Sequence, residues 1–276
     1  MIFLDSSHQS FFNENGYIIL PVLTNKTSAT VIEIIERCED KPSNPFFISI
    51  ELPNTKKRIE LQQKLTTILE QESKLNLLVQ QHFKLFSTSF IYQKNEQKSG
   101  FNLHTDWSFF DQEIKNPVFI WIPLQDVSIA ENNSTMIVVP KSHKIAIPYR
   151  GEGINEDYIE NIKNNFKHKF KYLEIKKGEA VFFNPSIIHG LLANNTTKHN
   201  YSLLSTMCEN DAKIIYCKPP KFNFFNKINV YAVNEIDDYY YVKTGKKSIN
   251  CLSLYKTVKK AKTKYTIEEI RHLLDN

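Results

Sequence analysis

The sequence lacks the features that mark disulfide-stapled and membrane-spanning proteins. Its four cysteines, Cys38, Cys208, Cys217 and Cys251, show neither CxxC nor any other zinc-type spacing. Scattered cysteines suit a reducing compartment, where most of them are small buried apolar residues. No window approaches 18 uninterrupted apolar residues, and the start "MIFLDSSHQS" has no basic segment followed by a long apolar run. These absences predict a soluble cytoplasmic protein without a membrane span.

A strong excess of one charge is also missing. Lys and Arg number 35 against 30 Asp and Glu, a net charge of +5, and the one dense basic run is "YKTVKKAKTKY" at 255–265. Nucleic-acid binding would require such charge on one face of a recognisable module, and the sequence contains none. We therefore expect no nucleic-acid partner, and at most a weak preference for anionic small molecules. With 276 residues and 41% hydrophobic residues, the chain can bury a sizeable core.

Short strands dominate the middle of the chain. The first part reads as helices: "SSHQSFFNENGYIILPVL" predicts a short helix, a stop at Gly16 and a strand, and residues 27–40 and 57–83 have apolar residues at helical spacing. From about 84 to 215, short runs rich in Phe, Ile, Val and Tyr alternate with turn residues, with one probable helix at 155–167. Eight such runs predict a mainly β fold, a double-stranded β-helix (jelly roll, cupin-like barrel) with flanking α-helices. They lie at 84–93, 102–110, 117–124, 135–140, 170–175, 179–184, 187–192 and 200–207.

We expect one compact unit, with residues 1–215 forming the barrel domain and its N-terminal helices, and 216–276 packed on it as a C-terminal extension. In the extension, "TIEEIRHLLDN" begins with a capping box formed by Thr266 and Glu269. The aromatic-rich stretch at 226–245 has a packing role as its simplest interpretation, with a dimer surface or a substrate lid as alternatives.

The stretch "LHTDW" at 103–107 carries two possible metal ligands, His104 and Asp106. On a strand, residues i and i+2 project from the same face. His189, in the apolar run "NPSIIHGLL", could supply a third ligand from another strand. Two histidines and one carboxylate on one face suit non-haem Fe(II). The alternatives are two polar residues at a sheet edge and a buried core histidine.

These motifs resemble the phytanoyl-CoA dioxygenase-like family of Fe(II)- and 2-oxoglutarate-dependent oxygenases. The likeness covers most of the first ~205 residues and includes "FFNENGYIILPVL", "LHTDW", "FIWIPLQDVSIAENNSTMIVVPKSHK" and "KKGEAVFFNPSIIHGLLANN". It implies Fe(II) held by His104, Asp106 and His189, with 2-oxoglutarate as cosubstrate and O2 and a small molecule as the other reactants. Because halogenating relatives lack the carboxylate, Asp106 favours hydroxylation or another oxidation. The chain is also similar to a branch found in bacterial carbohydrate gene clusters, which makes a sugar or sugar-nucleotide the expected substrate.

The chain departs from the family at the cosubstrate anchor. The family places an arginine eleven residues after the second histidine, and that position is Asn200 here. A guanidinium pairs with a carboxylate in a bidentate manner that lysine cannot reproduce. Strand alternation puts Lys198, Asn200 and Ser202 on one face, so Lys198 is the best cationic substitute, with a solvated turn lysine as the alternative.

The resemblance and strand parity suggest further contacts with the ligands. Trp121 matches a family aromatic near the cosubstrate, and Thr88 and Tyr92 share a face of the strand before "LHTDW". Arg150, in a loop flanked by Pro and Gly, is a candidate substrate contact at the mouth of the site. Trp121 could equally be a core residue, and Arg150 a solvated one.

Two other functions remain open at this point. The missing arginine favours a non-catalytic barrel that keeps a metal and binds a carbohydrate or metabolite. A cupin-like hydrolase or isomerase using Zn(II) or Mn(II) without O2 would also fit the ligand set.

Overall fold

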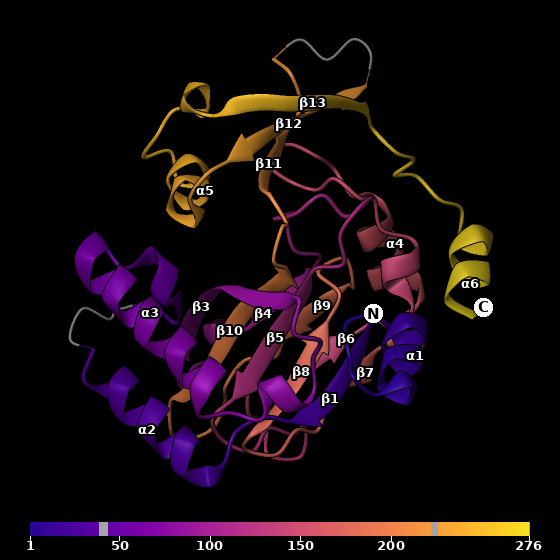
Figure 1. The fold of residues 1–276 in the computed structure, drawn as a ribbon. Helices are drawn as coiled ribbons and strands as arrows, with labels where there is room; N and C mark the ends of the chain where they lie inside the picture. Colours follow the sequence, from indigo (N-terminus) through magenta and orange to yellow (C-terminus); the bar gives the residue numbers. More distant parts are fainter. Residues whose placement is uncertain (39–43, 222–225, 276) are drawn as a thin grey trace.

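The computed structural model describes residues 1–38, 44–221 and 226–275, and two antiparallel sheets form its centre (Figure 1). The larger sheet has the strand order β1-β8-β5-β10-β3-β2 and the smaller one β4-β9-β6-β7. Apolar side chains from both sheets, including Phe119, Trp121 and Val138, form one cluster between them. This arrangement confirms the predicted mainly β jelly-roll class. The strands are β1 (Tyr17–Pro21), β2 (Phe46–Ile48), β3 (Phe83–Gln93), β4 (Phe101–His104), β5 (Val118–Pro123), β6 (Met136–Val138), β7 (Lys171–Tyr172), β8 (Glu179–Phe183), β9 (His189–Leu191) and β10 (Asn200–Glu209).

The N-terminal helices cover the outer face of the larger sheet. They are α1 (Ser6–Asn15), α2 (Asn25–Glu36) and α3 (Thr55–Gln71), and their apolar residues share a cluster with Phe90, Tyr92 and Leu203 of the sheet. Gly16 ends α1 in the left-handed region at φ 79°, as a residue without Cβ can do at little cost. The predicted helix, stop and strand are therefore confirmed. Residues 39 and 40 of the second expected helix lie outside the described residues.

Two further helices pack beside the smaller sheet. Helix α4 (Tyr158–Asn165) and helix α6 (Ile267–Asp275) share a buried cluster with Val139 and Ile188. The Thr266 N–H donates to Glu269 Oε2 and the Glu269 N–H donates to Thr266 Oγ1, which confirms the capping box. Because Ile270 and Leu274 of α6 are buried in this cluster, the end of the described chain lies against the barrel (Figure 1).

The rest of the C-terminal region forms a separate small sheet and one helix. Strands β11 (Ile214–Lys218), β12 (Lys227–Val233) and β13 (Ser253–Lys259) pair in that order, and α5 (Ile236–Lys243) follows β12. The Ile215 N–H donates to the Phe109 carbonyl at 2.8 Å, and the Tyr239 ring of α5 stacks on Phe109 with centroids 4.1 Å apart. Through these contacts α5 reaches the segment that follows "LHTDW". The division into a barrel domain at 1–215 and an extension at 216–276 packed on the same domain stays a prediction.

One strand is shorter than its sequence suggests. The run 102–110 predicts a strand throughout, but β4 ends at His104. Asp106 therefore does not lie on a regular strand; its N–H donates instead to the Pro185 carbonyl at 2.9 Å. Among the residues described, no helix has both the length and the apolar character needed to cross a membrane.

Candidate metal centre

The register of two neighbouring strands brings the two histidines together. In the antiparallel pair β4–β9, His104 and His189 are direct partners, and their ring centroids lie 4.3 Å apart. Gly190 permits this close approach, because a Cβ at that position would lie only 2.8 Å from the Phe101 carbonyl oxygen. The Phe101 ring packs against His104 and the Phe183 ring against His189, which holds both imidazoles in place.

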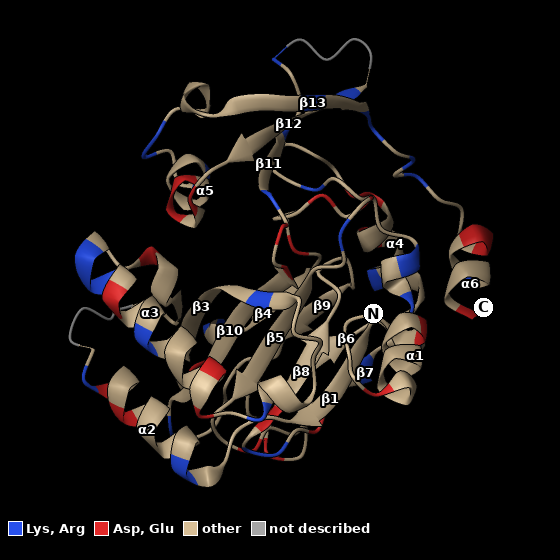
Figure 2. Cartoon of the chain, viewed as in Figure 1, with Lys and Arg blue, Asp and Glu red and all other residues tan. Residues whose placement is uncertain are grey.

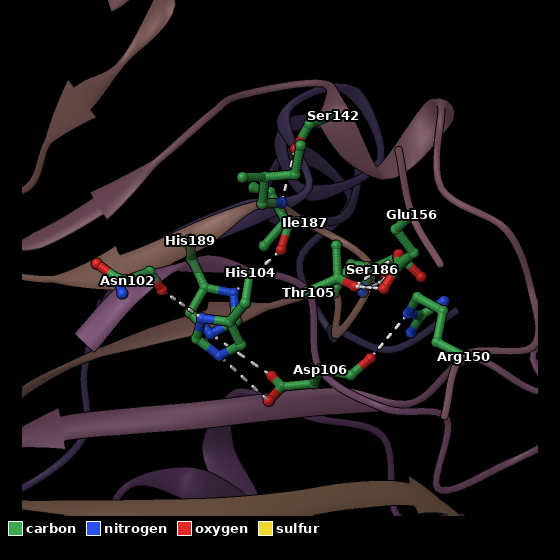
Figure 3. Close-up of polar contacts among 12 residues, drawn as sticks. Asn102, His104, Thr105, Asp106, Ser142, Arg150, Glu156, Ser186, Ile187 and His189 are labelled. Carbon is green, nitrogen blue, oxygen red and sulfur yellow. Dashed lines mark hydrogen bonds and ion pairs between the residues drawn. The ribbon is translucent and has the colours of Figure 1, made fainter. Parts of the chain in front are cut away.

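Both histidines direct the same ring nitrogen toward the centre. His104 Nδ1 lies 2.8 Å from the Asn102 carbonyl and His189 Nδ1 3.0 Å from the Ile187 carbonyl (Figure 3). A carbonyl can only accept, so each Nδ1 carries the proton and each Nε2 presents a lone pair. His104 Nε2 lies 3.8 Å from Asp106 Oδ1, and His189 Nε2 lies 3.6 Å from Asp106 Oδ2. The three side chains thus offer ligand atoms that all lie within 4.8 Å of one another.

The environment keeps His104 neutral. Burial, and to a smaller extent the neighbouring His189 ring, lowers the pKa of His104 to about 4 despite the opposing effect of Asp106. His104 is therefore deprotonated at neutral pH, which is the form that binds a metal.

Asp106 is positioned through its backbone. Arg150 Nε donates to the Asp106 carbonyl at 2.7 Å, while the Asp106 N–H is held by Pro185 (Figure 3). Asp106 Oδ2 is buried and accepts no hydrogen bond among the described residues. A buried carboxylate oxygen without a donor is unfavourable unless a cation completes its environment. Two imidazoles and this carboxylate form the donor set typical of non-haem Fe(II), so the residues present fit that ion.

Three of the expected cosubstrate residues lie between the two sheets. The Trp121 Nε1–H donates to Ser202 Oγ at 2.9 Å, and Asn200 Nδ2 donates to Ser134 Oγ at 2.8 Å. All four side chains are buried. Strand β10 thus directs Asn200 and Ser202 inward. At the position of the family arginine, the chain has the neutral amide of Asn200, whose hydrogen-bond partner Ser134 is also uncharged.

Thr88 and Tyr92 face the other way. Tyr92 belongs to the apolar cluster under the N-terminal helices and stacks on Tyr201, while Thr88 accepts a hydrogen bond from Ser205. The two residues do share a face, as their spacing indicates, but that face points away from His104 and His189. Both are therefore corrected from cosubstrate contacts to residues of the outer core, because alternation alone does not say which face encloses the site.

Arg150 also needs correction. It is fully buried, and its NH1 donates to the Ile147 carbonyl in addition to the bond from Nε to Asp106. A side chain enclosed in this way cannot contact substrate at a loop surface. Arg150 is instead a positioning residue for the Asp106 backbone.

Lys198 is exposed in the turn before β10. Only its backbone is tied down: the carbonyl accepts from Asn194 Nδ2 at 2.7 Å, and the N–H donates to Thr196 Oγ1. Alternation does not extend to Lys198 because the strand begins at Asn200. Among the described contacts, none connects its ammonium group to the candidate metal centre, so the structure gives no support to Lys198 as the substitute for the arginine.

Some residues around the centre were not identified from the sequence. Glu156 accepts from the Thr105 hydroxyl at 2.8 and 2.9 Å, and burial raises its pKa. On the opposite side, α5 brings Tyr240 and Lys243 close enough for Asp106 to influence the pKa of both. The helical spacing of Tyr240 and Lys243 was readable in "DDYYYVK", but their nearness to "LHTDW" depends on tertiary structure.

Comparison with known proteins agrees with this geometry. The family described as phytanoyl-CoA dioxygenase (PhyH) matches residues 12–200, a span that contains all three candidate ligands. No curated protein matches the sequence.

Several solved structures share the fold at low sequence identity. HygX from Streptomyces hygroscopicus, with nickel and 2-oxoglutarate bound, has a TM-score of 0.55 at 15% identity, over 75% of this chain and 88% of HygX. The α-ketoglutarate-dependent carbocyclase SnoK from nogalamycin biosynthesis has a TM-score of 0.53 at 15% identity, over 76% of this chain and 86% of SnoK. EvdO2 from Micromonospora carbonacea var. aurantiaca has a TM-score of 0.50 at 12% identity, over 75% of this chain and 91% of EvdO2. The family match over most of the chain shows that this protein belongs to the phytanoyl-CoA dioxygenase family of Fe(II)- and 2-oxoglutarate-dependent oxygenases.

Proposed function

We propose that His104, Asp106 and His189 bind Fe(II) and that the protein uses 2-oxoglutarate and O2 to hydroxylate a small molecule, with a sugar or sugar-nucleotide as the first candidate. The observation that carries the proposal is the convergence of two histidine Nε2 atoms and one carboxylate within 4.8 Å of one another. The unpartnered Asp106 Oδ2 supports it, because a cation would satisfy that atom.

Each residue has a separate role in this proposal. When bound, Fe(II) and 2-oxoglutarate supply the oxidising chemistry, in which O2 converts 2-oxoglutarate to succinate and CO2 while one oxygen atom enters the substrate. His104 and His189 hold their protons on Nδ1, so Nε2 stays available as a ligand. Arg150 fixes the Asp106 backbone. Trp121, Asn200 and Ser202 are the proposed lining of the cosubstrate site, since they share the space between the sheets.

The substrate class is the finer part of the proposal. HygX has also been solved with nickel, 2-oxoglutarate and hygromycin B bound, and SnoK and EvdO2 share its fold. These likenesses concern the fold, so they make a small-molecule substrate reasonable without identifying it.

Anaerobic titration with Fe(II), followed by 2-oxoglutarate, tests the metal and cosubstrate together. We expect a visible charge-transfer band from the chelate in the wild type and none in His104→Ala. Under air, the wild type should form succinate slowly without substrate, and this activity should be lost in His104→Ala. The absence of a band at millimolar 2-oxoglutarate would rule the proposal out.

A second function deserves a test because of Asn200. Its amide, bonded to Ser134, provides no positive charge for the distal carboxylate of 2-oxoglutarate. A barrel that binds metal and a carbohydrate without catalysis would fit this feature. It predicts metal binding without succinate formation, whereas an oxygenase forms succinate.

A further inference from the structure

Helix α5 spans from the N-terminal helices to the segment that follows Asp106. Arg58 of α3 forms an ion pair with Asp237 at 2.6 Å and donates to the Tyr241 hydroxyl, which fastens one side of α5. Tyr239 stacks on Phe109 at the other side. Figure 1 shows α5 below the three-stranded sheet and facing the barrel, and Figure 2 shows the acidic first turn that contains Asp237. The helix is thus held at both sides beside the candidate metal centre.

The two faces of α5 differ in character. Tyr239 and Val242, three residues apart, are buried in the cluster between the sheets and α5. Tyr240 and Lys243, also three residues apart, form a second stripe, in which Tyr240 is half-buried against the same cluster and Lys243 is exposed. Asp106 is among the charges that act on both Tyr240 and Lys243, so this second stripe lies near the carboxylate of the candidate metal centre.

Lys243 is exposed, and its ammonium group contacts an aromatic ring. Its Nζ lies 4.8 Å from the centroid of the Trp107 ring, next in sequence to Asp106. Surrounding protein lowers the pKa of the ammonium group, although Asp106 and Glu51 act in the opposite direction. In the described part of the chain, no carboxylate lies within ion-pair distance of Lys243. The contact with Trp107 is a cation–π interaction, which an anion can displace or share.

From this arrangement we propose that Lys243, with Trp107 and Tyr240 beside it, binds a phosphate group of the primary substrate. The proposal rests on the proposed function, and it narrows the substrate class from sugars in general to sugars that carry such a group. The ammonium group supplies the charge, and the Tyr240 hydroxyl, for which no hydrogen bond is recorded within the described residues, supplies a further donor. Lys243 therefore acts in substrate recognition, and Trp121, Asn200 and Ser202 serve the cosubstrate.

Calorimetric titration of the protein loaded with Ni(II) and 2-oxoglutarate tests this assignment. The probes are glucose 1-phosphate, UDP-glucose and uncharged methyl glucoside. We expect the wild type to bind at least one phosphorylated probe more tightly than methyl glucoside. Lys243→Met should weaken that binding about tenfold, in line with the loss of one partly exposed charge contact. Lys243→Arg should retain most of the affinity, and Lys246→Met, at an exposed neighbouring lysine, should retain all of it.

Several results would overturn the assignment. The wild type could bind no phosphorylated probe, or bind it as well after Lys243→Met. Weaker 2-oxoglutarate binding in Lys243→Met, with phosphate binding unchanged, would show that Lys243 serves the cosubstrate instead. Failure of the oxygenase proposal is separable, because it appears as absent succinate formation in the wild type. The intrinsic fluorescence of Trp107, one of two tryptophans, gives a second readout, since displacement of the ammonium group should change its emission in the wild type and not in Lys243→Met.

Discussion

The two flanks of the Asp106 segment differ in how their polar groups are satisfied. On the buried flank, Arg150 donates to the Asp106 and Ile147 carbonyls while its buried NH2 has no hydrogen-bond partner among the described residues, and Glu156 accepts from the Thr105 hydroxyl. On the flank facing α5, the Lys243 ammonium group meets only the Trp107 ring among recorded contacts. Polar groups that build a site are normally satisfied within the fold, whereas those that bind a ligand are left available. The two recorded bonds of Arg150 suit a positioning residue, and the single ring contact of Lys243 suits the recognition role that we propose for it.

Replacing Arg150 should have the largest effect on the free energy of unfolding. Replacing Arg150 with Met leaves the Asp106 carbonyl without its donor and removes a positive charge close to the buried Glu156. Breaking such a buried charged network costs about 3 kcal/mol or more of unfolding free energy. Urea unfolding would measure the change, with Lys198→Met as an exposed control expected within about 0.5 kcal/mol. Similar stabilities for the two variants would show that Arg150 is not a positioning residue.

A substitution at Gly190, where β4 and β9 approach each other closely, should have the next largest effect on stability. Gly190→Ala places a methyl group 2.8 Å from the Phe101 carbonyl, so β4 and β9 must separate. We expect a loss of about 1–3 kcal/mol, as for other overpacked positions, and at least tenfold weaker Fe(II) binding. Gly245→Ala is the control, because no atom lies within 4 Å of its added Cβ and only its backbone, at φ +73°, is strained. Equal metal affinity in both variants would contradict this account of Gly190.

Lowering the pH should reduce the stability of the metal-free protein, because His104 takes up a proton more readily in the unfolded chain. Its folded-state pKa of about 4 lies below the ordinary value of 6.5, so the unfolded chain binds the proton first and stability falls as the pH drops from about 6.5 to about 4. Allowing for the solvent access of His104, we expect a loss of about 1–2 kcal/mol. Unfolding in EDTA at pH 7 and pH 4.5 measures it. His104→Gln should show a smaller loss, and an unchanged loss would assign the effect to other groups.

The smallest effects should distinguish the two faces of the larger sheet. Ser202→Ala removes the acceptor of the Trp121 Nε1–H and should reduce stability by about 1 kcal/mol and weaken 2-oxoglutarate binding. Tyr92→Phe changes a side chain on the opposite face, so cosubstrate affinity should remain as in the wild type. Measuring the 2-oxoglutarate affinity of both variants would decide which face of the sheet lines the cosubstrate site. Weaker 2-oxoglutarate binding in Tyr92→Phe would place Tyr92 in that site after all.

The sequence predicts the local parts of this structure well. The two ligands of "LHTDW" are separated by one residue, and the strand with His189 is recognisable from its apolar run, so the candidate ligand set could be named before the fold was known. Thr88 and Tyr92 show the limit: parity correctly puts them on one face, but burial on both sides of the sheet hides which face is inner. Arg150 shows the same limit for loops, because the loop sequence does not indicate the direction of its side chain. Lys243 could not be connected to Asp106, since that contact depends on the packing of a distant helix.

The three candidate ligands come from β4, β9 and the segment after β4, whereas the groups we assign to recognition come largely from α5, which follows them in the chain. Evolution can therefore exchange the side chains on the second stripe of α5 without altering the atoms that would hold the ion. On our proposal, substrate recognition and metal binding depend on different segments of the chain, so homologues with the same ligand residues but other side chains at the positions of Tyr240 and Lys243 should accept different compounds.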